Sequence, residues 1–183
     1  MSGEVPTIDW DRWLGACGTG SETLQQLLDA TPQLAGTLIA VAAPASDGEP
    51  YGRRPLHRGE SGEVLLVRWR EDTFCAPHDH GSAAGFVVLL RGRFVERRWR
   101  STAEGLALAG ERAIAAPAIV AVRAHDIHSM KATEGGVGLH FYLPAITGMS
   151  VYDCERRETL TVGDDCGAWV PGDPALVSRR VGW

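Results

Sequence analysis

The chain has 183 residues, of which 44% are hydrophobic and 22% charged, and its formal net charge at pH 7 is -5. This composition is typical of a soluble globular protein with a sizeable core, so we expect a single domain over residues 1–183. The negative charge argues against a nucleic-acid-binding protein, and no apolar stretch is long enough to cross a bilayer.

The start of the chain and its cysteines favour a reducing compartment. Residues 1–6 lack the basic stretch followed by an apolar one that marks a signal peptide, so we expect a cytoplasmic protein. The four cysteines are scattered and form no Cys-x-x-Cys pair, which favours free thiols over a disulfide framework or a zinc knuckle. We expect a monomer or a weak homo-oligomer with no nucleic-acid or membrane partner.

Residues 7–43 predict a helical segment. Apolar residues recur there at helical spacing in three short runs. The runs are a first helix capped by Thr7 or Asp9, a second that Ser21 caps, and a third over residues 33–42. We expect these helices to pack outside a sheet, with Trp10 and Trp13 as core anchors rather than ligand contacts.

The next part of the chain changes character. Residues 44–62 are rich in Pro, Gly and Ser and predict a connecting loop, and from residue 64 the apolar period becomes two, which predicts strands. The segments so predicted are strands at 64–70, 82–90, 94–100, 113–116, 119–123, 137–143, 149–153 and 159–162, turns at Arg91–Gly92 and Gly135–Gly136, and a loop over 101–110. Many short strands after N-terminal helices indicate an all-β core, an antiparallel double-stranded barrel over about residues 51–163.

A histidine pair at the start of the predicted hairpin is the main functional signal. His78 and His80 are two residues apart, so on an extended chain both imidazoles point to the same face, as a first-row metal ion needs. A third ligand is required, and the candidates are His125, His128, His140 and the acids near the pair, of which Asp79 should face the other way on a strand. We favour His128, because it begins the run into the last core strand and such barrels commonly draw the third ligand from a distant strand.

These features resemble the cupin superfamily and, within it, the cysteine dioxygenase family. The similarity covers about residues 51–153: Tyr51-Gly-Arg53, a tryptophan at 69 nine residues before His78, the His-x-His pair, and Leu-His-Phe-Tyr-Leu-Pro at 139–144. Ordinary cupins add a glutamate shortly after the His-x-His. Residues 81–85 contain no acid here, so the site is all-histidine, as in thiol dioxygenases.

The resemblance implies a double-stranded β-helix (cupin) fold and a non-haem iron enzyme of cysteine catabolism. Fe(II) and O2 would oxidise the thiol of L-cysteine to cysteine sulfinate. The site residues so implied are His78, His80 and His128 as iron ligands, Arg53 as the group that holds the substrate carboxylate, Tyr51 and Trp69 beside it in the substrate site, and His140 and Tyr142 as catalytic residues.

The chain also departs from the family pattern. Gly138 replaces a serine of the Ser-His-Tyr relay, Gly85 replaces the cysteine that animal members cross-link to the tyrosine, and Ala84 and Met149 replace a histidine and a cysteine. A pocket for another thiol carboxylate, such as 3-mercaptopropionate, is therefore an alternative, although Arg53 favours cysteine because enzymes for that substrate tend to carry glutamine there. A cupin enzyme with Zn, Mn or Ni and a non-catalytic metal-binding cupin are further alternatives.

Overall fold

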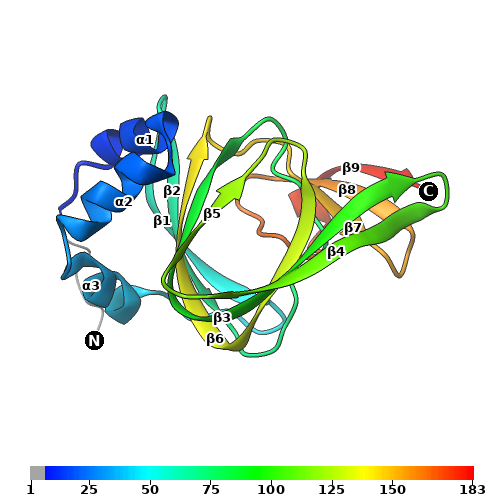
Figure 1. The fold of residues 1–183 in the computed structure, drawn as a ribbon. Coiled ribbons are helices and arrows are strands. Elements are labelled where there is room, and N and C mark those ends of the chain that lie inside the picture. The colour runs from blue at the N-terminus through cyan, green and yellow to red at the C-terminus, as the bar shows by residue number, and fades with distance from the viewer. Residues whose placement is uncertain (1–6) are drawn as a thin grey trace.

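The structure is a computed structural model that describes residues 7–183; residues 1–6, where no signal peptide is expected, lie outside the described part. Helices come first and strands follow (Figure 1). The helices are α1 Trp10–Thr19, α2 Ser21–Asp29, α3 Leu34–Val41 and a short 3-10 helix, η1, at Pro174–Leu176. The strands are β1 Tyr51–Gly59, β2 Gly62–Trp69, β3 Ala84–Thr102, β4 Gly105–Ala115, β5 Ala118–Val122, β6 Ile127–Leu143, β7 Ser150–Asp153, β8 Glu158–Val162 and β9 Val177–Gly182.

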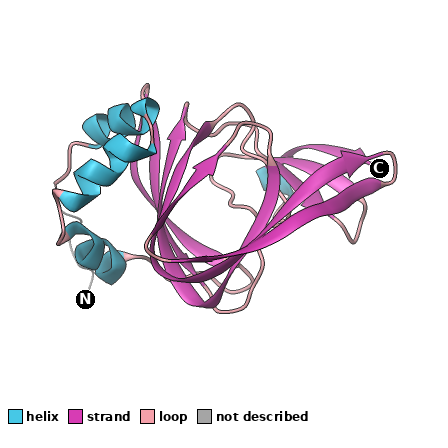
Figure 2. Cartoon of the chain, viewed as in Figure 1, coloured by secondary structure: helices cyan, strands magenta, loops and turns pink. Residues whose placement is uncertain are grey.

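Two antiparallel sheets form the body of the molecule (Figure 2). The larger has the order β1-β2-β6-β3-β4 with β5 paired to β3, and the smaller has the order β7-β8-β9. The segment before β3 joins them, because His78 forms a bridge to His128 of β6 and another to Val151 of β7. The predicted all-β core with N-terminal helices is confirmed, and its two sheets meet at the histidine pair.

The helices cover the outer face of the large sheet. On β6, Leu139 and Phe141 pack with Trp13 and Leu14 of α1, and the ring of Phe141 stacks on that of Trp13 at 6.1 Å between centroids. The alternate residues of the same strand point into the barrel instead. Trp10 and Trp13 are therefore core anchors, as predicted. No helix of residues 7–183 is long and apolar enough to cross a membrane.

Several predicted turns and loops are wrong, because this chain bends its strands rather than ending them. Neither Arg91–Gly92 nor Gly135–Gly136 is a turn: Gly92 of β3 lies opposite Gly136 of β6, and the register shifts on both sides of Gly92. A Cβ on Gly92 would lie 2.4 Å from the Gly135 carbonyl oxygen, and the φ of Gly92 is +107°. Glycines at such a bulge let two long strands approach and coil around the barrel.

The two predicted loops also contain strands. Most of residues 101–110 belongs to the β3–β4 hairpin, because β4 starts at Gly105 and pairs with the end of β3. Tyr51–Gly59 forms β1 and pairs with β2, although the surrounding segment is rich in Pro and Gly. In the helical part, Asp9 caps α1 by accepting a bond from the Arg12 amide at 3.1 Å, as predicted. Ser21 is the first residue of α2 and no side chain caps that helix, so its predicted capping role is wrong.

Candidate metal centre

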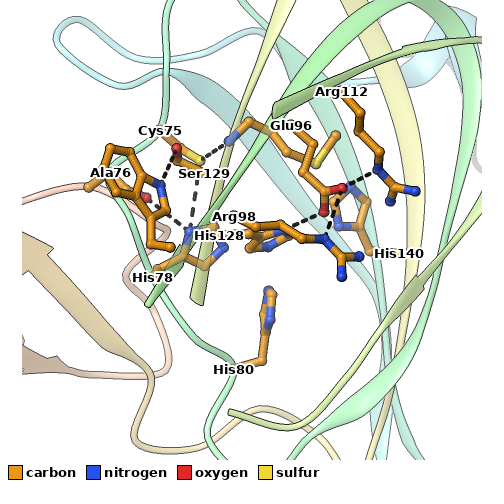
Figure 3. Close-up of polar contacts among 12 residues, drawn as sticks. Cys75, Ala76, His78, His80, Glu96, Arg98, Arg112, His128, Ser129 and His140 are labelled. Atoms are coloured by element: carbon orange, nitrogen blue, oxygen red, sulfur yellow. Dashed lines mark hydrogen bonds and ion pairs between the residues drawn. The ribbon is translucent and has the colours of Figure 1, made fainter. Parts of the chain in front are cut away.

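Three histidine side chains meet where the two sheets join (Figure 3). His78 and His80 come from the segment between β2 and β3, and His128 comes from the start of β6. One ligand atom of each lies within 4.8 Å of the others. The structure therefore brings together the three histidines that the sequence suggested as metal ligands. His125, the competing candidate, is exposed three residues before His128.

Backbone hydrogen bonds hold this arrangement. The amides of His78 and His128 each donate to the other residue's carbonyl oxygen at 2.9 Å. On the other side, the Asp79 amide donates to the Ser150 carbonyl oxygen at 3.0 Å. The Asp79 carboxylate points away from the histidines and accepts bonds from the amides of Gly81 and Ser150. The histidine segment is thus tied to both sheets, which limits its freedom to move.

The Nδ1 atoms of His78 and His128 already have hydrogen-bond partners. His78 Nδ1 lies 3.0 Å from the Ala76 carbonyl oxygen, which can only accept, so Nδ1 carries the hydrogen. His128 Nδ1 lies 3.0 Å from Oε1 of Glu96. Both rings therefore leave Nε2 free as a ligand atom. His80 Nδ1 is buried and has no partner within the described chain. This donor set fits a metal ion that accepts imidazole nitrogen.

Burial keeps the site histidines neutral. It lowers the pKa of His78 to about 3, and the nearby His128 lowers it further in the same direction. Burial likewise lowers the pKa of His140 to about 3, and burial together with His78 lowers that of His80 well below the usual value. Because metal ions bind the neutral imidazole, these histidines are in the ligating form at neutral pH.

Tyr142 lies between two imidazoles. Its hydroxyl is 3.0 Å from His140 Nδ1 and 3.3 Å from His80 Nε2, and its ring stacks on the His80 ring at 4.9 Å. Burial raises the pKa of the Tyr142 phenol well above its ordinary value, so the phenol keeps its proton. The other nitrogen of His140, Nε2, is buried, has no hydrogen-bond partner among residues 7–183 and faces Gly138, where a Cβ would lie 3.0 Å away. Gly138 is the position at which the family resemblance implies the serine of the Ser-His-Tyr relay.

Arg53 of β1 lies in the wall of the same cavity. Its Nη1 donates to the carbonyl oxygens of Cys166 at 2.6 Å and Asp164 at 3.3 Å, and its Nη2 donates to Asp164 at 3.2 Å. Nε–H and one hydrogen of Nη2 are left for a ligand. The neighbouring Arg54 points elsewhere and donates to the Val41 carbonyl oxygen at 3.2 Å. The structure thus separates two arginines that the sequence could not distinguish.

The cavity has a volume of about 50 Å³ and holds only a few water-sized groups. Tyr51 and Trp69 line it and pack against each other at 4.6 Å between ring centroids. The Tyr51 hydroxyl accepts a bond from the Ala168 amide at 2.7 Å, so it fixes the wall of the cavity. The residues that line the cavity are Tyr51, Arg53, Glu63, Leu65, Val67, Trp69, His78, His80, Val87, His128, Met130, His140, Tyr142, Ile146, Met149, Val162, Gly163, Asp164, Cys166 and Gly167.

Two parts of the site were not predicted. The first is Glu96, a buried carboxylate on β3 that contacts His128. The sequence offers one sign of this position. Glu96 stands two residues after the apolar Phe94, so both side chains lie on the same face of the strand. The second is the segment 163–168, whose carbonyl and amide groups hold Arg53 and Tyr51. Its composition is Gly-rich and gives no sign of this role.

Comparisons with known proteins agree with the geometry. A family model described as cysteine dioxygenase type I matches residues 42–155. The chain belongs to the cysteine dioxygenase type I family. The matched segment contains all three histidines, Arg53 and Tyr142, whereas the helices α1–α3 and the segment 163–168 lie outside it.

Solved structures resemble this chain at low sequence identity. An uncharacterised conserved protein with a double-stranded beta-helix domain from Klebsiella pneumoniae is 13% identical and covers 62% of this chain and 87% of its own, with a TM-score of 0.52. KdgF from Halomonas sp. is 13% identical and covers 54% of this chain and 83% of its own, with a TM-score of 0.44. The predicted cupin fold is confirmed. Together with the three-histidine group, the family indicates a metal-dependent dioxygenase of the cupin fold.

The structure gives a physical reason for one of the chain's departures from the family pattern. Gly85 lies opposite Tyr142 in the pairing of β3 with β6. A Cβ at position 85 would lie 2.0 Å from the Phe141 carbonyl oxygen, which is far inside van der Waals contact. The backbone therefore leaves no room for a cysteine there, and Tyr142 has no partner for a cross-link at that position.

Proposed function

We propose that this protein is a thiol dioxygenase that uses Fe(II) and O2 to oxidise the thiol of L-cysteine to cysteine sulfinate. Both oxygen atoms of O2 pass to the sulfur, so no external reductant is needed. The observation that carries the proposal is the three-histidine group without a carboxylate ligand, in one small cavity with an arginine. A set of neutral ligands leaves the full charge of a divalent ion, which favours an anionic thiolate.

His78, His80 and His128 would hold the iron, which supplies the activation of O2 and of the thiol sulfur when it is bound. The chain prepares these ligands beforehand. Ala76 and Glu96 accept the Nδ1 hydrogens of His78 and His128, so the lone pairs of both Nε2 atoms are free. Burial keeps the rings of His78 and His80 neutral, so no proton has to be removed from them before metal binds.

Arg53 would orient the substrate. Three hydrogen bonds to the carbonyl oxygens of Asp164 and Cys166 fix the plane of its guanidinium group, and its remaining N–H groups can donate to a carboxylate. Such a pair fixes direction as well as distance, which places the thiol at the other end of a short substrate near the histidines. The small cavity favours a short substrate over a long one.

Tyr142 and His140 would supply and hold a proton. The Tyr142 phenol is protonated and can donate a hydrogen bond to an oxygen atom or to the substrate carboxylate. His140 Nδ1 is neutral and lies 3.0 Å from the phenol oxygen, so it can accept or return that proton. Burial excludes water from both groups, which strengthens these hydrogen bonds.

An oxygen electrode tests the proposal directly. The protein is loaded with Fe(II) without air and then given L-cysteine, 3-mercaptopropionate or cysteamine in air-saturated buffer. We expect oxygen uptake with L-cysteine and a product that carries two 18O atoms from 18O2 by mass spectrometry. Faster turnover of 3-mercaptopropionate would change the substrate but keep the reaction class. If no thiol stimulates oxygen uptake by an iron-loaded sample, the proposed function is wrong.

A further inference from the structure

Glu96 is a buried acid with no place among the expected ligands. It lies on β3 and is 2% exposed. In the register of the sheet it stands opposite Arg112 of β4 and Met130 of β6, and Arg98, two residues on, stands opposite His128. Glu96 therefore reaches His128 diagonally across the strand pair, a distance that long side chains span.

The two carboxylate oxygens of Glu96 make different contacts (Figure 3). Oε1 lies 3.0 Å from His128 Nδ1, and Oε2 lies 2.5 Å from Nε of Arg112 and 3.7 Å from Nε of Arg98. Both arginines are about half exposed, whereas the carboxylate is not. A strand ion pair needs only the Arg112 contact. An ion pair with Arg112 does not explain why Oε1, the second carboxylate oxygen, contacts the imidazole of His128.

Glu96 does not touch the cavity that contains Arg53 and Tyr142. It lines a second cavity, of about 200 Å³, together with Arg98 and Trp99; this cavity shares His80 and His128 with the first. Among the residues that line the first cavity, Glu96 makes its hydrogen bond to His128, so a change at Glu96 should act on that cavity through His128. The guanidinium groups of Arg112 and Arg98 place positive charge beside the other oxygen of this carboxylate, at 2.5 and 3.7 Å.

We propose that Glu96 is a positioning residue of the metal centre, which holds His128 with Nε2 toward the metal and adds negative charge to an otherwise neutral ligand set. The proposal rests on the proposed function only in that the three histidines bind a divalent metal. A carboxylate that accepts from Nδ1–H fixes the ring and makes Nε2 a stronger donor. Arg112 competes for the same carboxylate, so it limits this effect.

Metal affinity measured by chelator competition tests the proposal without turnover. Co(II) is titrated into apo protein that circular dichroism shows to be folded. Loss of the charge in Glu96→Gln should raise the Kd for Co(II) by about 10- to 100-fold. It should also change the visible Co(II) spectrum and raise the Fe(III)/Fe(II) potential of the iron-loaded protein. Glu111→Gln removes a glutamate that pairs with Arg97 on the same two strands, and it should leave the Kd unchanged.

Arg112→Gln separates positioning from a structural role and covers the case in which Glu96→Gln does not fold. If Glu96 acts on His128, removal of its competitor should lower the Kd for Co(II), opposite in sign to Glu96→Gln. If Glu96 only holds the strands together through Arg112, both variants should weaken binding alike, which overturns the proposal. Equal Kd values for wild type and Glu96→Gln would also overturn the positioning role of Glu96, but they would leave the proposed function unaffected. Absence of metal binding in wild type overturns both.

Discussion

Arg53 and Arg54 are neighbours in β1, yet their guanidinium groups serve different parts of the molecule. Arg53 faces the cavity and is held by carbonyl oxygens of Asp164 and Cys166, whereas Arg54 faces α3 and is held by Val41. Alternation along a strand sends adjacent side chains to opposite faces. At the scale of single residues, this alternation decides which arginine can meet a substrate.

Arg53→Ala should raise the KM for L-cysteine by about 10- to 100-fold, because a charged hydrogen bond contributes about 1.5–3 kcal/mol. The KM for cysteamine, which has no carboxylate, should not change. Arg54→Ala is the matched control and should leave both values at the wild-type level. Steady-state oxygen uptake measures all of them, and an equal rise for both thiols in Arg53→Ala would show that Arg53 does not bind the carboxylate.

Gly85 allows a second prediction at this scale. Gly85→Cys should lower the melting temperature strongly, because its Cβ would lie 2.0 Å from a backbone oxygen that β-pairing holds in place. Gly110→Ala of β4, where a Cβ meets nothing within 4 Å, is the control and should melt close to wild type. Intact mass should show no loss of hydrogen in Gly85→Cys. A purified variant with a thioether to Tyr142 would contradict this account of the position.

At the scale of elements, the cavity depends on a segment without regular structure. Residues 163–168 follow β8 and return to β1, where they meet both Arg53 and Tyr51. The family match ends at residue 155, so this wall is supplied by the part of the chain beyond it. Its contacts with Arg53 and Tyr51 are backbone groups, whereas the Asp164 carboxylate pairs with Arg58 of β1 at 2.7 Å, so one side chain of the segment also ties it to β1.

Tyr51→Phe tests this coupling. The change removes the acceptor of the Ala168 amide, which is buried at that point, and an unpaired buried amide costs about 1–3 kcal/mol of the free energy of unfolding. Urea unfolding should show that loss. Tyr152→Phe, whose hydroxyl makes only a 3.4 Å bond to Asp79, should lose less. Equal midpoints for Tyr51→Phe and wild type would mean that the segment does not depend on β1.

At the scale of the whole molecule, the fold carries several neutral histidines in its interior. The pKa values of His78 and His140 lie at about 3, below the value of roughly 6.5 for an unfolded chain. Between these values the unfolded chain binds protons that the folded one does not, so stability falls as pH falls through this window. Above pH 6.5 these imidazoles are unprotonated in both the folded and the unfolded chain, so they no longer make the stability depend on pH.

The apo protein should therefore lose stability from about pH 6.5 downward, with a slope of about 1.4 kcal/mol per pH unit for each such histidine. Urea unfolding at several pH values measures the slope. His140→Gln should reduce it by about 1.4 kcal/mol per pH unit, because one buried imidazole is gone. Identical slopes in His140→Gln and wild type would show that His140 is not held neutral.

Local patterns in the sequence were sufficient for the helices, for the alternation of β6 and for the histidines that come together. These features depend on spacing along the chain: Leu139 and Phe141 alternate with His140 and Tyr142, and His78 and His80 share a face. The turns predicted at Arg91–Gly92 and Gly135–Gly136 are wrong for the same reason. Within a few residues of sequence, a glycine that bends a strand cannot be distinguished from one that ends it.

Only the tertiary structure decided the surroundings of the histidines. Glu96 reaches His128 across two strands, Arg53 is distinguished from Arg54 by carbonyl groups more than a hundred residues away, and Gly85 is required by a carbonyl of a paired strand. Each contact joins residues far apart in the chain through backbone geometry, which leaves no local pattern. The three histidines that come together could therefore be predicted from the sequence, whereas the groups that orient them could not.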